Sequence, residues 1–158
     1  MYRIIVALML TTIALTGIAR GEECTPAVYG GLVIEGKNAD ANRLWETATA
    51  TYERILADCR SQVPDSDFPK IYDALAVSQL MQEQYSAALD TAKKCLDRDG
   101  RYSACMMIAA RASLKLGDRA MAEQFARDAL AVEPTDEYAT AVAIDAKDFL
   151  KRLAKPQQ

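Results

Sequence analysis

Two adjoining stretches of equal length decide the fold: PKIYDALAVSQLMQEQYSAALDTAKKCLDRDGRY at residues 69–102 and SACMMIAARASLKLGDRAMAEQFARDALAVEPTD at residues 103–136. They align without a gap at an offset of 34 residues. Small and apolar residues recur at matching places: Ala76 and Ala110, Leu80 and Leu114, Ala88 and Ala122, Ala92 and Ala126, Leu96 and Leu130. A repeat of this length indicates helical units that stack side by side and bury a shared core.

Each unit is predicted to hold two helices. The spacing of apolar residues favours helices over about 69–82 and 85–98 in the first unit, and over about 103–116 and 119–132 in the second. Asp118 follows the break inside the second unit and is its expected N-cap. Gly100 and Pro134 occupy matching places where the units end, because both residues stop helices.

Further helices are expected on both sides of the repeats. Residues 40–60 carry apolar side chains at helical spacing and should cover the open side of the first repeat. Residues 136–154 are apolar on one side and charged on the other, which predicts a C-terminal capping helix with Thr135 as its N-cap. The stretches 25–39 and 61–68 are rich in Gly, Pro, Asn and Asp, so we predict loops there.

The N-terminus resembles a secretory signal. Arg3 supplies a positive charge, a short apolar run covers residues 4–15, and small residues follow at Gly17, Ala19 and Gly21. The run is shorter than the roughly 20 residues that cross a bilayer, so no membrane span is expected after cleavage, although an uncleaved anchor is the alternative. The expected plan is a signal peptide at 1–21, a loop segment at 22–39, a helical domain at 40–154 and a tail at 155–158.

We therefore expect an exported protein. A bacterial periplasm fits better than a eukaryotic secretory route, because the signal is short and the chain has no Asn-x-Ser/Thr acceptor for glycosylation.

Composition argues against catalysis. The 158 residues contain no histidine, the side chain most used for acid–base chemistry near neutral pH and for binding zinc. The stretch from Gly31 to Asn38 imitates a phosphate-binding loop, but it lacks the Ser or Thr that would hold magnesium. We therefore expect no enzymatic activity, no cofactor and no metal site. A formal net charge of −3 also argues against nucleic acid as a partner.

The four cysteines are Cys24, Cys59, Cys95 and Cys105. In an oxidising compartment an even number suggests two disulfides, and four cysteines allow three pairings. Cys95 and Cys105 lie five residues either side of Gly100, where a turn between antiparallel helices would bring them within bonding range. That pairing leaves Cys24 for Cys59. The alternative is that Cys95 and Cys105 are buried apolar side chains that stay reduced.

These features resemble the tetratricopeptide repeat family, whose unit is a 34-residue pair of antiparallel helices. The second unit carries Ala110, Leu116-Gly117-Asp118, Ala122, Ala129 and Ala131-Val132-Glu133-Pro134. The first unit keeps Tyr72, Ala76, Tyr85, Ala88 and Cys95, but it has Gly100 where the family has proline. The resemblance covers about 68 of the 158 residues. It implies an all-α, right-handed solenoid of helical hairpins, with two repeats and flanking N- and C-terminal capping helices.

The resemblance also implies a binding surface, because the first helix of each unit in this family lines a concave groove. The matching positions here are Lys70, Asp73, Val77, Leu80, Met81, Ala104, Met107, Arg111, Leu114 and Lys115. Of these we expect Val77, Met81, Met107, Arg111 and Lys115 to contact a partner, since methionines adapt to irregular peptides. The alternative for so short an array is that Val77, Leu80, Met81 and Leu114 are core against the flanking helices.

The predicted function is that of a non-enzymatic adaptor or scaffold in the cell envelope or secreted space, with a protein or peptide as its partner. The groove lacks the Asn and Lys arrangement with which some members of the family hold a C-terminal carboxylate. A structural or assembly subunit, which self-associates or belongs to an envelope complex, is the alternative. The oligomeric state does not follow from the sequence.

Overall fold

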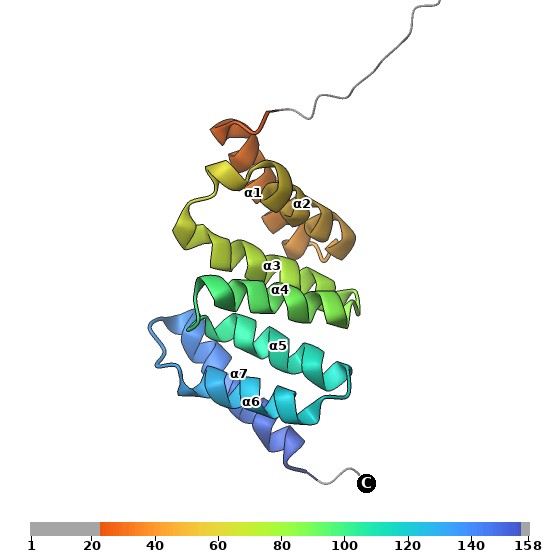
Figure 1. Cartoon of the computed structure of the whole chain (residues 1–158), viewed down its shortest axis with the longest axis vertical. Helices are drawn as coiled ribbons and strands as arrows, with labels where there is room; N and C mark the ends of the chain where they lie inside the picture. The colour runs from red at the N-terminus through yellow and green to blue at the C-terminus, as the bar shows by residue number, and fades with distance from the viewer. Residues whose placement is uncertain (1–22, 156–158) are drawn as a thin grey trace, which may run out of the picture.

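The computed structural model describes residues 23–155, which form seven α-helices and no strand (Figure 1). The helices are α1 (Pro26–Ala41), α2 (Trp45–Asp58), α3 (Phe68–Met81), α4 (Tyr85–Arg98), α5 (Ser103–Lys115), α6 (Arg119–Ala131) and α7 (Glu137–Leu153). Two short 3-10 turns, Arg60–Gln62 and Asp65–Asp67, lie between α2 and α3. The predicted signal peptide at 1–21 lies outside the described residues.

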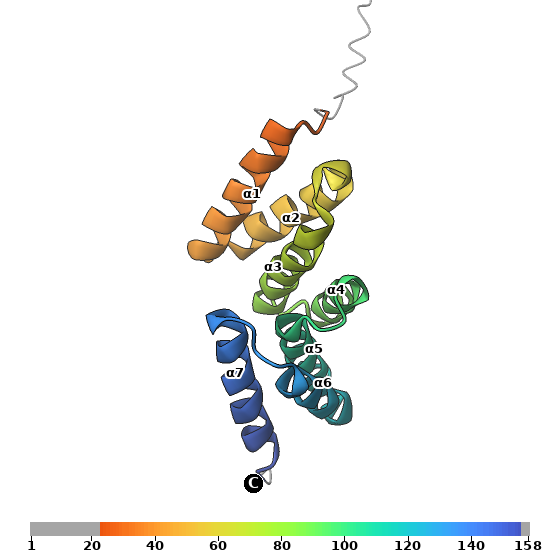
Figure 2. The same ribbon diagram turned by 90° about the vertical axis from the view of Figure 1, so that its left-hand side faces the viewer.

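Six of these helices pair into three antiparallel hairpins that follow one another in a row (Figures 1 and 2). The pairs are α1 with α2, α3 with α4, and α5 with α6, and α7 packs against α5 and α6 at the end of the row. The chain is therefore an all-α solenoid of helical hairpins, as predicted. The four helices predicted inside the repeats agree with α3 to α6 to within one residue at each end.

Helix α1 corrects the prediction of a loop at 22–39. Thr25 caps this helix by accepting a hydrogen bond from the backbone nitrogen of Val28 at 3.3 Å, and Pro26 is its first residue. Each of its three glycines costs about 1 kcal/mol relative to alanine, so the segment is a poor helix by propensity. Burial of Leu32 and Ala39 in the core offsets that cost. The prediction was wrong because packing, not propensity, decides the conformation here.

Helices α1 and α2 form a third unit of the same design as the two repeats. The three hairpin turns place a residue with positive φ at the same point: Arg43 at 59°, Glu83 at 61° and Gly117 at 87°. In each turn that residue and the next one donate backbone hydrogen bonds to the last turn of the preceding helix, at 2.9–3.1 Å. This is the Schellman pattern of a helix end. The helix predicted at 40–60 is thus not a cap but the second helix of the first hairpin, and it begins at Trp45.

A longer connection explains why the first unit escapes a search for a constant period. Arg43 and Glu83 are 40 residues apart, whereas Glu83 and Gly117 are 34 apart. Residues 59–67 join α2 to α3, but only residues 99–102 join α4 to α5. The long connection is held to the second hairpin at Phe68, whose ring lies 5.5 Å from the guanidinium of Arg60 and 4.7 Å from that of Arg98.

Small residues let the helices approach closely. The alanines at the repeat positions, Ala48, Ala76, Ala88, Ala92, Ala110, Ala122, Ala126 and Ala129, are all fully buried. Two disulfides join Cys24 to Cys59 and Cys95 to Cys105, with Cα–Cα distances of 5.1 and 6.3 Å, in the pairing favoured by the sequence. On chain entropy alone they would contribute about 4 and about 3 kcal/mol.

Helix α7 is the first helix of an unfinished fourth unit. Its N-cap is Asp136 and not Thr135 as predicted, since the Asp136 carboxylate accepts a hydrogen bond from the backbone nitrogen of Ala139 at 2.7 Å. Ile144 lies 34 residues after Ala110, but no second helix covers it, so it is 60% exposed. On its other side α7 buries Phe149 and Leu153 and closes the core, as expected of a capping helix.

Candidate peptide-binding groove

The first helices of the units, α3 and α5, together with α7, present the predicted groove. In Figure 2 the second helices α4 and α6 lie on the opposite side of the row from α7. Two hollows open between these elements, one near the start of α5 and one near its end. We call them the tyrosine hollow, after Tyr102 and Tyr138, and the basic hollow, after Arg111, Lys115 and Arg152.

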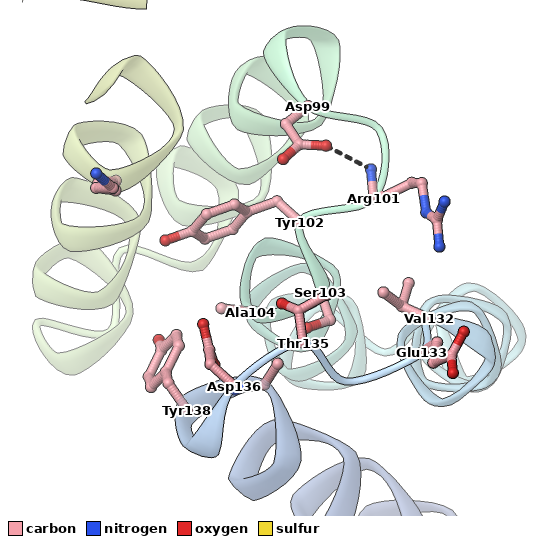
Figure 3. A pocket seen from close by; sticks show the side chains of 12 residues that line it. Asp99, Arg101, Tyr102, Ser103, Ala104, Val132, Glu133, Thr135, Asp136 and Tyr138 are labelled. Carbon is pink, nitrogen blue, oxygen red and sulfur yellow. Dashed lines mark hydrogen bonds between the residues drawn. The ribbon is translucent and has the colours of Figure 1, made fainter. Parts of the chain in front are cut away.

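The tyrosine hollow has a volume of about 500 Å³ and is lined by α3, the connection between α4 and α5, and the start of α7. Figure 3 shows Tyr102 and Tyr138 on its wall, and Asp99, whose carboxylate accepts a hydrogen bond from the backbone nitrogen of Arg101 at 3.0 Å. Burial raises the pKa of Tyr102 to about 12 and also raises the pKa of Tyr138. Both hydroxyls therefore stay protonated at neutral pH and can donate hydrogen bonds.

Asp73 lies beside this hollow, on the groove side of α3. The hydroxyl of Tyr138 donates a hydrogen bond to its Oδ2 at 3.2 Å, which links α7 to α3. Its Oδ1 is buried and has no hydrogen-bond partner among the described residues. Burial raises the pKa of the Asp73 carboxyl to about 6, against the lowering effect of the Tyr138 hydrogen bond and with a smaller increase from Asp40. The linkage of α7 to α3 thus runs through a carboxyl that is unusually easy to protonate.

Asp40 holds the first hairpin to the second. It accepts hydrogen bonds from the hydroxyl of Tyr52 at 2.6 Å and from the hydroxyl of Ser78 at 3.1 Å, and so connects α1, α2 and α3. Ser78 is fully buried, so this polar cluster fixes how α3 packs on the first hairpin. The floor of the groove is therefore tied to rigid elements on its N-terminal side.

The basic hollow has a volume of about 470 Å³ and lies where α3, α5 and α7 end. Its lining is Leu80, Met81, Glu83, Tyr85, Arg111, Leu114, Lys115, Phe149 and Arg152. Leu80, Leu114 and Phe149 make an apolar floor, since all three are at least partly buried. Three cations and one acid stand around that floor, although the whole chain is net acidic.

Three of the predicted partner-contacting residues come together in the basic hollow. Met81 is 53% exposed, and Arg111 and Lys115 line the same hollow from α5. Met107 is a correction: it is only 3% exposed, because it lies in the core cluster that contains Phe149. The alternative of core packing is thus right for Met107, a residue that it did not name. Val77 is half-buried and lines neither hollow.

The sequence analysis missed the groove residues that α7 supplies. Tyr138, Phe149 and Arg152 line the two hollows, but α7 was predicted only as a cap. The signal was present, because continuing the offset of 34 from α5 places Tyr138 at the position of Ala104 and Phe149 at that of Lys115. Extending the repeat into the capping helix would have found both.

Within residues 23–155 no group of His, Cys, Asp or Glu side chains is arranged to hold a metal ion. Nor does any helix in that range have both the length and the apolar character needed to cross a membrane.

Comparison with known proteins identifies a fold. No family model matches the sequence, and no curated protein matches it. Among solved structures the chain is similar to PcrH from Pseudomonas aeruginosa, with a TM-score of 0.72 and 19% identity over 88% of this chain and 99% of that one. It is also similar to SycD, the type III secretion translocator chaperone of Yersinia enterocolitica, with a TM-score of 0.69 and 15% identity over 81% and 91% of the two chains.

A third similar structure is the TPR domain of Arabidopsis OM64, with a TM-score of 0.61 and 16% identity over 77% of this chain and 96% of that one. Identities this low show a shared fold and nothing more. That fold is the tetratricopeptide-like helical solenoid.

Proposed function

We propose that this chain is a non-enzymatic protein–protein interaction adaptor that holds a peptide or a short helix against α3, α5 and α7. The observation that carries the proposal is the basic hollow, which combines an apolar floor with the exposed side chain of Met81. Burying apolar surface contributes about 25 cal/mol per Å², and methionine adapts its shape to the partner. The polar rim would then fix the register of the bound segment.

The structural neighbours support a peptide as the partner. PcrH has been solved in complex with the chaperone binding region of PopD and with that of PopB. The same arrangement of helices therefore holds segments of other proteins in PcrH. We carry over only this class of partner, because the identity between the chains is too low to carry over its sequence.

We also propose that the adaptor works in the cell envelope or the secreted space, with a bacterial periplasm favoured. The signal-like residues 1–21 support this location, as do the two bonded cysteine pairs, since disulfides persist in oxidising compartments.

Affinity capture with groove variants tests the adaptor role. The Met81→Asp/Lys115→Glu double variant of the tagged full chain should lose the partner that the unchanged chain captures from its native host. The matched control is Met121→Asp/Lys94→Glu, which makes the same changes on α6 and α4, away from both hollows. Circular dichroism must show that both variants stay helical. Equal capture by the two variants would refute binding in the groove.

One observation favours the second candidate, a subunit that self-associates or joins an envelope complex. Gly31 and Ile34 in α1 occupy the places where α5 has Cys105 and Ile108, both of which are buried against the preceding hairpin. No hairpin precedes α1 within residues 23–155, and Ile34 is 62% exposed. Light scattering on the unchanged chain and on Ile34→Glu would detect assembly through this end, and a monomer in both would dismiss it.

A further inference from the structure

The basic hollow differs from the rest of the molecule in its charge. The chain carries 22 acidic and 19 basic residues, but the hollow has Arg111, Lys115 and Arg152 against Glu83 alone. The tyrosine hollow, by comparison, mixes two cations with three acids. A local excess of one charge around an apolar floor selects partners by their chemistry as well as by their shape.

The three cations keep capacity for a ligand. Arg111 donates one hydrogen bond to Asp145 of α7 at 2.6 Å, which leaves other N–H groups of its guanidinium unused. The ammonium of Lys115 lies 5.7 Å from the centre of the Tyr85 ring, a contact that uses none of its three hydrogen-bond donors. Arg152 makes no hydrogen bond or ion pair within residues 23–155.

We propose that the basic hollow binds an acidic, apolar peptide segment. An aliphatic or aromatic side chain would enter the floor formed by Leu80, Leu114 and Phe149. Aspartate or glutamate carboxylates beside it would pair with Lys115 and Arg152, with Arg111 held in place by Asp145. The apolar floor distinguishes such a peptide from a simple anion, and the cations distinguish it from a basic or neutral one. This inference rests on the proposed adaptor function and specifies its partner.

Selection from a library of displayed random 12-residue peptides tests the inference with the full chain immobilised. Selected peptides should be enriched in Asp and Glu next to Leu, Ile, Phe or Trp. Selection on Lys115→Gln/Arg152→Gln should still enrich apolar peptides, but without the acidic residues. The control variant Lys93→Gln/Lys94→Gln removes two exposed cations from α4, outside both hollows, and should leave the acidic preference unchanged.

The affinity of one selected peptide, measured by fluorescence polarisation, should fall about fivefold for each cation removed, and the loss should shrink as salt is raised. Enriched peptides with no acidic preference would overturn this inference and leave the adaptor function standing. The same outcome follows if the acidic preference survives in Lys115→Gln/Arg152→Gln. No enrichment at all would count against the adaptor function, and this inference would fall with it.

Discussion

Gly36 sits where α1 and α2 approach so closely that a side chain has no room. A Cβ atom built on it would lie 2.8 Å from Cε1 and Cζ of the Tyr52 ring. The ring cannot easily move, because Tyr52 is buried and its hydroxyl is bonded to Asp40. The glycine therefore has the role that alanine has at the matching positions Ala76 and Ala110, in a tighter contact.

Replacing Gly36 by alanine should destabilise the fold by about 1 kcal/mol. Overpacking costs about 1–3 kcal/mol, and the better helix propensity of alanine returns up to about 1 kcal/mol. The control is Gly30→Ala in the same helix, where the new Cβ would meet nothing within 4 Å, so this change should be stabilising. Urea unfolding followed by circular dichroism measures both. A gain from Gly36→Ala equal to that from Gly30→Ala would contradict the close contact.

Asp73 should make the stability depend on pH between about 4 and 6. The pKa of its carboxyl rises from an ordinary 3.8 to about 6 in the folded chain, mainly through burial. Below pH 4 both the folded and the unfolded states are protonated, and the cost of a buried charge is absent. As pH rises through this window the unfolded state ionises first, so the free energy of unfolding falls.

The Asp73→Asn variant should remove that cost while keeping an acceptor for the Tyr138 hydroxyl. We expect it to be more stable than the unchanged chain at pH 7.5, by about 1–3 kcal/mol. The difference should disappear near pH 4. Urea unfolding of both chains at several pH values measures it, and a difference that stays constant with pH would contradict the raised pKa.

Among the groove residues, the sequence predicts those that belong to a recognisable repeat. Met81, Arg111 and Lys115 were placed by matching the two units to each other, and the structure brings all three to one hollow. Met107 occupies an equivalent position but is buried, because α7 packs over this part of α5. Whether a position on the groove side is open depends on the next helix in the row, which the pattern of a single helix does not contain.

At the scale of the helices, apolar periodicity predicts α3 to α6 closely because each of them has one buried stripe. Helix α1 defeats the same reasoning, since its three glycines lower helix propensity and suggest a loop. Its structure follows from contacts with α2 and from the disulfide that joins Cys24, just before it, to Cys59 at the end of α2. Those contacts are distant in sequence, so composition within the segment cannot reveal them.

The start of α7 offers a test of the helix caps. Asp136→Ala should cost about 1 kcal/mol, because it removes the carboxylate that accepts the backbone hydrogen bond from Ala139. Thr135→Ala should change the stability by less than about 0.5 kcal/mol, since Thr135 is exposed and lies outside the helix. Thermal unfolding of the two variants compares them. A larger loss from Thr135→Ala would restore the cap predicted from the sequence.

The whole molecule is a row of three hairpins and a closing helix, which meets the requirement of about three repeats for a continuous core. The row has an outer side formed by second helices and an inner side formed by α3, α5 and α7, where both hollows lie. The inner side is also linked across the row by the hydrogen bond between Asp73 and Tyr138. Recognition of a partner is expected on this side, because it combines rigid support with exposed apolar and basic side chains.

Site-specific photocrosslinking tests that expectation most directly. A benzoylphenylalanine is placed at Met81 in the basic hollow or at Met121 on α6, two exposed methionines on different sides of the row. The full chain is irradiated in its native host, and adducts are identified by mass spectrometry. We predict a protein adduct from position 81 and none from position 121. An adduct from position 121 alone would contradict binding on the inner side.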